Sequence, residues 1–132
     1  LLCDAYNANP ASMRAALELL SEIEVPEGGR RVAVMGDMLE LGPGAPAAHR
    51  EVGAHAASLD IDAVFALGSH AAETAEGAIS AGFPAGASHA FEARDRLTEA
   101  LQAFVKPGDL LLLKGSRGLA MESVGQALGF EM

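Results

Sequence analysis

Two polar segments, far apart in the chain, carry residue types that recognise small polar ligands. Residues 4–12 contain Asn7 and Asn9, and residues 114–117 contain Lys114 and Arg117. Each segment follows an apolar, strand-like run and precedes a helical pattern, and open α/β sheets bind their ligands at such positions. Asparagine amides donate and accept hydrogen bonds, while lysine and arginine bind carboxylates and phosphates. The two segments therefore predict one shared ligand site.

The first segment also has a purely structural interpretation. Asn9 followed by Pro10 is typical of a helix N-cap and a first helical position, and Asn7 would then only shape the turn. A helix N-terminus nevertheless favours an anion through its unpaired N–H groups. The sequence leaves both interpretations of these asparagines open.

The second segment has the same ambiguity. Lys114, Ser116 and Arg117 offer two cations and a hydroxyl at the end of a strand, with Gly115 allowing close backbone approach. A carboxylate ligand would form charge-assisted hydrogen bonds to these cations. Alternatively the segment is a solvated strand end, with Arg117 paired to Glu122.

A third polar segment, residues 36–42, follows the apolar run 31–35. Its acids Asp37 and Glu40 could meet a substrate amine, or they could support a rigid loop and cap the helix expected to begin near residue 47. We assign Asp37, Glu40 and His49 to loop support, since His49 lies near that helix start, within reach of the loop. The four histidines show no metal-ligand spacing, so no metal site is predicted.

Composition restricts the class of protein. The chain has 132 residues, a net charge of −9, 50% hydrophobic residues and a single cysteine. This acidity argues against a nucleic-acid partner or an anionic membrane surface. One cysteine cannot form an internal disulfide, which favours a reducing, cytoplasmic compartment. No apolar run is long enough to insert into a membrane.

The elements that must position these segments follow from alternating apolar runs and amphipathic stretches. We expect a single α/β domain with a Rossmann-like, open, mostly parallel sheet of five to six strands and helices on both faces. The most continuous apolar run, 110–113, should be buried on both faces at the sheet centre. The run 88–91 should lie toward an edge. Strands are expected at 1–4, 31–35, 63–67, 88–91 and 110–113. Helices are expected after Asn9, from about 47 with Leu59 on the inward face, from a Ser69 cap to about 81, around 97–104 and around 121–128.

The absent motifs are also informative. The chain contains no phosphate-loop pattern, no dinucleotide fingerprint, no nucleophile elbow and no zinc-protease pattern. Nothing in this chain completes a catalytic apparatus. An oxidoreductase is therefore disfavoured, although the expected fold is Rossmann-like.

Several of these segments together resemble one family, the Mur ligases. The matching residues read Asp-Ala-Tyr-Asn-Ala-Asn-Pro-Ala-Ser-Met at 4–13, Gly-Asp-Met-Leu-Glu-Leu-Gly at 36–42, His49 with Val52-Gly53, and Lys-Gly-Ser-Arg at 114–117 with Met121-Glu122. Their order is similar to that in the ligases that add D-alanyl-D-alanine to UDP-N-acetylmuramoyl-tripeptide. The resemblance spans the whole chain as a C-terminal domain. Ala5 departs from it, because a serine is common there.

The resemblance implies an ATP-dependent ligase of peptidoglycan synthesis that works through an acyl phosphate. It implies that residues 1–132 receive D-alanyl-D-alanine and close over ATP. The N-terminal and central domains, with the sites for the UDP sugar, the ATP phosphates and Mg²⁺, would then be absent from this chain, as the missing initiator Met also suggests. Asp4 and Tyr6 would lie on the ATP ribose side, and the dipeptide cleft would be lined by Asn7, Asn9, Lys114, Ser116 and Arg117. The isolated domain would be inactive and would bind no cofactor tightly.

A different class of function remains open on sequence grounds. The chain could be a stand-alone, non-catalytic α/β module that binds a small ligand. An upstream phosphate loop in the same gene would favour the ligase, whereas a start codon just before Leu1 would favour the module.

Overall fold

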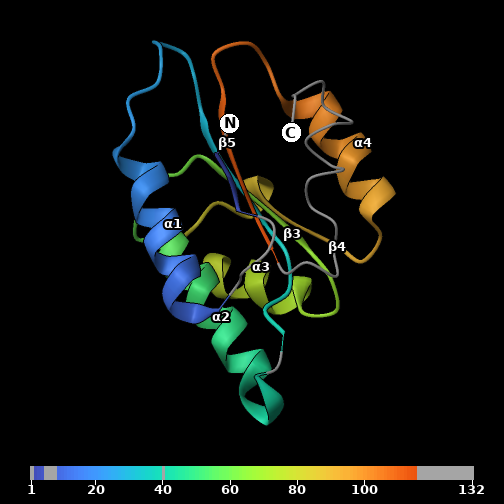
Figure 1. The fold of residues 1–132 in the computed structure, drawn as a ribbon. Coiled ribbons are helices and arrows are strands. Elements are labelled where there is room, and N and C mark those ends of the chain that lie inside the picture. The colour runs from blue at the N-terminus through green and yellow to red at the C-terminus, as the bar shows by residue number, and fades with distance from the viewer. Residues whose placement is uncertain (1, 5–8, 40, 116–132) are drawn as a thin grey trace.

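Five parallel strands form one sheet in the computed structural model, which describes residues 2–4, 9–39 and 41–115 (Figure 1). The sheet order is β1-β5-β2-β3-β4, and every neighbouring pair is parallel. Parallel pairing requires a crossover between consecutive strands, and helices provide those crossovers here. The strands are β1 (Leu2–Asp4), β2 (Arg31–Met35), β3 (Ala63–Leu67), β4 (Ser88–Phe91) and β5 (Leu110–Lys114).

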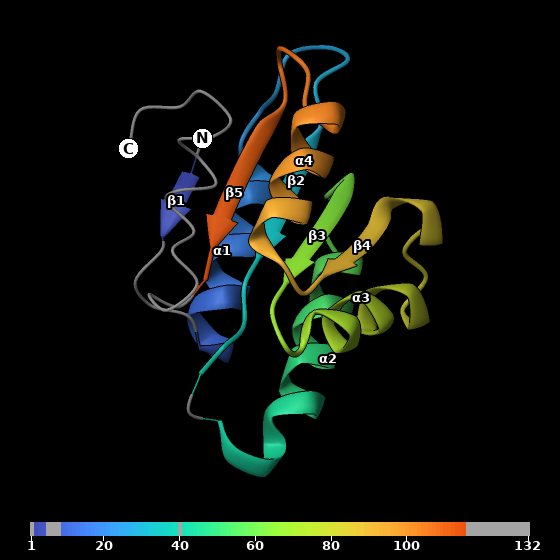
Figure 2. The ribbon, with the colours of Figure 1, turned by 90° about the vertical axis from the view of Figure 1, so that its right-hand side faces the viewer.

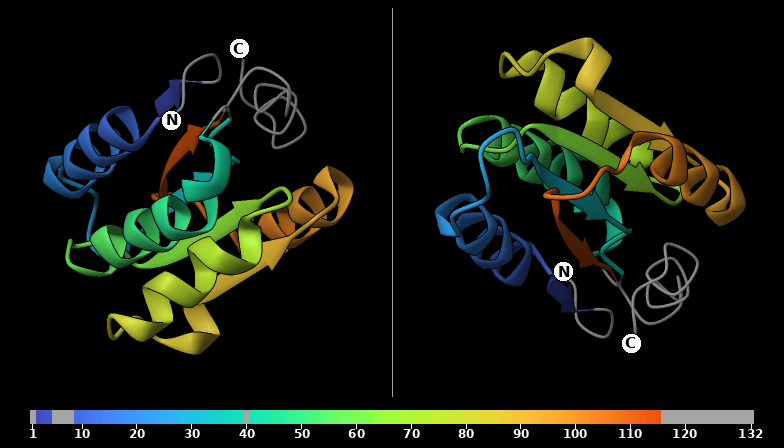
Figure 3. Two further views of the ribbon diagram at one scale, coloured as in Figure 1. Left: turned by 90° about the horizontal axis from the view of Figure 1, so that it is seen from below. Right: turned by 90° about the horizontal axis from the view of Figure 1, so that it is seen from above.

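Helices cover both faces of the sheet (Figure 3). The helices are α1 (Pro10–Glu22), α2 (Ala45–Ala57), α3 (Ala71–Ser80) and α4 (Arg94–Phe104), with short 3₁₀ turns at Gly42–Gly44 and Ala85–Ala87. Buried side chains of α1, α2 and α3 share one hydrophobic cluster, while those of α4 belong to a second cluster. None of the helices in the described ranges is long and apolar enough to cross a membrane.

Successive side chains of each inner strand point to opposite faces of the sheet, so they pack alternately into the two clusters. Leu112 packs into the cluster under α1 and α2, whereas Leu111 and Leu113 pack into the cluster under α4. On β2, Ala33 and Val34 divide in the same way. A parallel strand buried on both faces must be apolar at every position, which accounts for the continuous runs in the sequence.

Several expectations need correction. β5 is an inner strand, but β2 holds the middle of the sheet (Figure 2). Helix α2 begins at Ala45 rather than near residue 47, because Pro46 occupies a first-turn position and needs no N–H partner there. It ends at Ala57, so Leu59 packs against the core from beyond the helix. The α/β class, the parallel pairing and the edge position of β4 are confirmed, and the helix expected at 121–128 lies outside the described residues.

Helices α2 and α3 pack with their backbones in close contact. A Cβ built on Gly53 would lie 2.0 Å from the Thr74 carbonyl oxygen, and one on Gly77 would lie 2.1 Å from the Arg50 carbonyl oxygen. No side chain fits at either position. The two glycines therefore allow the close approach of α2 and α3.

An ion pair lies at the amino ends of β2 and β5, opposite to the carboxyl ends of the strands. The Arg30 guanidinium donates to both carboxylate oxygens of Asp109, at 3.2 and 2.7 Å, and lies over the Phe104 ring. Burial raises the pKa of the Asp109 carboxyl, but hydrogen bonds from Arg30 and from the Lys106 N–H outweigh this effect and hold the pKa below its ordinary value. The hydrogen bond from Arg30 to Asp109 correspondingly raises the pKa of Arg30.

Candidate ligand site at the carboxyl edge of the sheet

The carboxyl ends of the strands bring the three predicted segments to one edge. Met35 pairs with Lys114, and Lys114 pairs with Asp4, so the ends of β2, β5 and β1 are neighbours (Figure 2). The Gly36 N–H donates to the Lys114 carbonyl oxygen at 2.7 Å. The loop after β2 therefore starts against the end of β5, and ligands of open α/β sheets bind at this edge.

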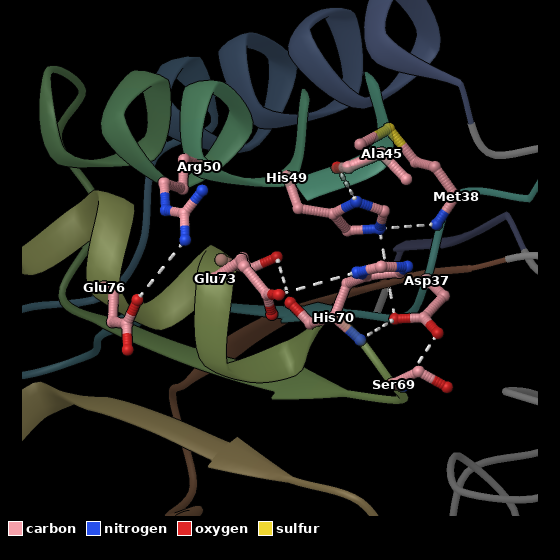
Figure 4. Close-up of polar contacts among 10 residues, drawn as sticks. Asp37, Met38, Ala45, His49, Arg50, Ser69, His70, Glu73 and Glu76 are labelled. Carbon is pink, nitrogen blue, oxygen red and sulfur yellow. Dashed lines mark hydrogen bonds and ion pairs between the residues drawn. The ribbon is translucent and has the colours of Figure 1, made fainter. Parts of the chain in front are cut away.

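The carboxylate of Asp37 caps helix α3 from a different loop. Its Oδ2 accepts a hydrogen bond from the Ser69 N–H at 2.8 Å, and its Oδ1 accepts one from the His70 N–H at 3.0 Å (Figure 4). A carboxylate at a helix N-terminus satisfies unpaired N–H groups and complements the helix dipole. The expectation that this acid caps the helix near residue 47 is wrong. The expectation that Ser69 caps the following helix is also wrong, because that helix has no local side-chain cap and receives Asp37 instead.

His49, on the first turns of α2, is held by two hydrogen bonds. Its Nε2 accepts from the Met38 N–H at 3.0 Å, so its Nδ1 carries the proton and donates to the Ala45 carbonyl oxygen at 2.6 Å (Figure 4). The side chain is only 2% exposed. This pattern fixes the neutral Nδ1–H tautomer. The 3.9 Å approach of Nε2 to Asp37 is therefore not a charged pair.

A second histidine lies beside this one. The His70 ring stacks on the His49 ring with centroids 4.6 Å apart. Its Nδ1 is buried, has no hydrogen-bond partner among the described residues and lies 3.8 Å from Glu73 on the next turn of α3. Stacking on His70 closes the side of His49 that faces α3 (Figure 4).

Lys114 ends β5 with its side chain inside the protein. The residue is 1% exposed and makes polar or electrostatic contact within the structure. Burying an ammonium group costs free energy unless it is paired, so the Lys114 side chain is held by contacts within the protein and not by solvent. The interpretation of Lys114 as a solvated strand end is therefore wrong.

Asn9 carries the N-cap of α1. Its Oδ1 accepts from the Ser12 N–H at 2.9 Å, and the Ser12 hydroxyl accepts from the Asn9 N–H at 3.0 Å. This reciprocal pair is a capping box. The Asn9 acceptor is thus used by the helix.

The other predicted site residues are placed only in part. For Asp4 the structure gives the backbone position on β1. Tyr6, Asn7, Glu40, Ser116 and Arg117 lie outside the described residues. Sequence reasoning missed the role of residues 68–70, although a glycine directly after a buried strand was a usable signal. Among the described residues, no group of three or more His, Cys, Asp or Glu side chains could hold a metal ion.

Fold and site together define an α/β domain that gathers polar loops at the carboxyl edge of a parallel sheet. The sequence pattern of the family described as "Mur ligase, glutamate ligase domain" matches residues 1–117. The chain belongs to this family.

Curated relatives and solved structures agree with that assignment. The chain is 40% identical over 94% of its length to UDP-N-acetylmuramoyl-tripeptide--D-alanyl-D-alanine ligase of Bacillus subtilis, and 42% identical over 97% to the enzyme of that name from Escherichia coli. A crystal structure of MurF from Acinetobacter baumannii superimposes with a TM-score of 0.82 at 33% identity, covering 95% of this chain and 27% of that one. MurF ligase from Thermotoga maritima in complex with ADP gives 0.69 at 28% identity, covering 95% of this chain and 26% of that one. This chain spans 26% of the length of either curated relative.

Proposed function

We propose that this chain is the C-terminal part of a longer ATP-dependent ligase that joins D-alanyl-D-alanine to UDP-N-acetylmuramoyl-tripeptide in peptidoglycan synthesis. The observation that carries the proposal is 40% and 42% identity, over nearly the whole chain, to two proteins that bear this enzyme's name. We refer below to the longer gene product as the parent ligase. A reaction that consumes ATP and a nucleotide-linked sugar places the parent ligase in the cytoplasm.

In the proposed reaction the terminal carboxylate of the tripeptide attacks the γ-phosphorus of ATP, which releases ADP and gives an acyl phosphate. The free amine of D-alanyl-D-alanine then attacks the acyl carbon. The tetrahedral intermediate collapses, inorganic phosphate leaves, and the amine loses a proton. The second step depends mainly on positioning, because holding the amine and the acyl phosphate in the correct orientation lowers the activation barrier.

This chain's share is to receive the dipeptide and to close over the nucleotide. We assign the dipeptide cleft to Asn7, Asn9, Lys114, Ser116 and Arg117, at the carboxyl ends of β1 and β5. Since Lys114 is 1% exposed, a dipeptide carboxylate would reach its ammonium group only if the surrounding chain rearranges when the ligand binds.

The nucleotide side of the cleft is assigned to Asp4 and Tyr6, and the parallel pairing of Asp4 with Lys114 places β1 directly beside β5. The ATP phosphates, Mg²⁺ and the UDP sugar are assigned to parts of the parent ligase outside this chain. Mg²⁺ would neutralise phosphate charge there. Among the described residues there is no acidic or histidine cluster to hold that ion.

Steady-state kinetics of the parent ligase test this function. Continuous ADP release should require both UDP-N-acetylmuramoyl-tripeptide and D-alanyl-D-alanine, and omission of the dipeptide should limit it to a single turnover at most. Asp4→Asn should raise KM for ATP roughly tenfold, by loss of a charge-assisted hydrogen bond, while KM for the dipeptide changes less. Arg117→Lys keeps the charge but loses the planar fork, and should lower kcat/KM for the dipeptide. A gene that starts at this chain, or a parent protein without ADP release, would overturn the proposal.

A further inference from the structure

A set of hydrogen bonds at the carboxyl edge connects the ends of three strands through one short loop. The Gly36 N–H binds the end of β5 at the Lys114 carbonyl, and Asp37 binds the N–H groups that follow β3. Two residues after Gly36, the Met38 N–H is bound by His49 of α2. Residues 36–38 are thus held from three directions. We call these contacts the edge network.

The two side chains of the network are almost completely buried and expose little surface to a ligand. The side chain of Asp37 is 9% exposed and that of His49 is 2% exposed. Both oxygens of Asp37 accept backbone N–H groups, and both ring nitrogens of His49 are engaged. The hydrogen bonds of these two side chains therefore hold backbone groups of the protein in place.

The backbone that they hold is hydrogen-bonded, through Gly36, to the end of β5, where the candidate cleft begins. Gly36 contacts the end of β5, and residues 114–117 are the segment assigned to the dipeptide. Beyond Met38 the loop becomes open to solvent, with Leu39 half exposed. A cleft wall of this kind must be fixed to well under an ångström to orient a reacting amine.

We propose that His49 and Asp37 are positioning residues of the dipeptide cleft, acting through the backbone of residues 36–38 on the end of β5. This rests on the proposed function. The decisive contact is the hydrogen bond from the Met38 N–H to His49 Nε2, because it fixes the loop directly after Asp37. Neither side chain touches substrate.

Two amide variants of His49 separate positioning from plain helix stability. In His49→Gln the amide oxygen reaches the former Nε2 position and can still accept from Met38, while the contact to Ala45 is lost. In His49→Asn the shorter amide can still donate to the Ala45 carbonyl, but Met38 loses its acceptor. The matched control is His55→Gln on the same helix, where the amide replaces the ring nitrogen that lies 3.1 Å from Glu18 and touches no part of the edge network.

The experiment uses the parent ligase, with kinetics and thermal midpoints for each variant. We expect His49→Asn to lower kcat/KM for D-alanyl-D-alanine about tenfold or more, His49→Gln to restore most of it, and His55→Gln to leave it unchanged. KM for UDP-N-acetylmuramoyl-tripeptide should not change. In a sample labelled with ¹⁵N-methionine, the Met38 amide should shift and exchange faster in His49→Asn than in His49→Gln.

Equal kcat/KM values for the two amide variants would overturn the proposal, as would losses that simply follow the thermal midpoints. Should His49→Asn fail to fold, Asp37→Asn provides the second variant, since its amide can accept only one of the two N–H groups of residues 69 and 70. It should lower the same kcat/KM with the Met38 amide signal displaced, and an unchanged kcat/KM would contradict the proposal. A wild-type parent protein that releases no ADP contradicts the proposed function instead, while the Met38 signal still reports the edge network.

Discussion

The carboxylate of Asp37 occupies the space beside Gly68 in which any side chain would have to lie. A Cβ built on Gly68 would stand 2.4 Å from Asp37 Cγ, and the backbone there has φ +124°. Asp37 can therefore cap α3 only because residue 68 is a glycine. The N–H groups of the next two residues point at the carboxylate as a consequence of that close approach.

Gly68→Ala should destabilise the chain by about 2–4 kcal/mol, because it adds backbone strain and displaces the α3 cap. Urea unfolding measures the change. Gly86→Ala is the matched control, since a Cβ there meets nothing within 4 Å and the backbone is not left-handed. Equal midpoints for the two variants would show that the Asp37 cap is not coupled to Gly68.

Gly77→Ala should destabilise the chain by about 2–4 kcal/mol, although alanine favours a helix over glycine by about 1 kcal/mol. The added methyl would meet the Arg50 backbone of α2 and force the two helices apart. Glu76→Ala is the control on the neighbouring position, where an exposed 3.9 Å ion pair with Arg50 contributes little. A stabilised Gly77→Ala variant in thermal unfolding would refute the close packing.

Asn9→Ala should cost about 1 kcal/mol, because the N-cap of α1 is lost, while Asn9→Asp keeps an acceptor for the Ser12 N–H and should keep the stability. The same pair of variants tests the ligand role in the parent ligase. If the Asn9 amide also binds the dipeptide, Asn9→Asp should lower kcat/KM for D-alanyl-D-alanine at unchanged thermal midpoint. Full activity in Asn9→Asp would limit this residue to capping.

Asp109→Asn should destabilise the chain by about 2–4 kcal/mol at neutral pH. The Asp109 side chain is 1% exposed, and its replacement by a neutral amide would leave the Arg30 guanidinium without its anion. The folded pKa of Asp109 lies below its ordinary value of 3.8. Its contribution to stability is therefore complete above 3.8 and is lost as the pH falls through the folded pKa.

Urea unfolding at a series of pH values should accordingly show a steeper acid loss in the wild type than in Asp109→Asn. Asp60→Asn is the control, since Asp60 pairs with Arg31 at the surface and is 77% exposed. Parallel pH profiles for wild type and Asp109→Asn would contradict the assigned cause of the pKa shift.

Sequence pattern alone determined the α/β class, the parallel strands and the start of α1. Buried parallel strands must be apolar at every position, and Asn9-Pro10 reports a helix start through local backbone chemistry. The motifs at 4–13, 36–42 and 114–117 also pointed to the family to which the chain belongs. All of these signals lie within short stretches of chain, so they can be read without knowing what packs against them.

Only the tertiary structure decided what Asp37, His49 and Lys114 contact. Asp37 caps a helix that begins far along the chain, since β2 and β3 pair in register and bring their ends together. His49 meets Met38 because α2 packs back over its own entry loop, and Lys114 is buried because β5 lies between β1 and β2. Hydrogen-bond partners and burial depend on which segments become neighbours in space, and that choice is made by packing of the whole core rather than by local sequence.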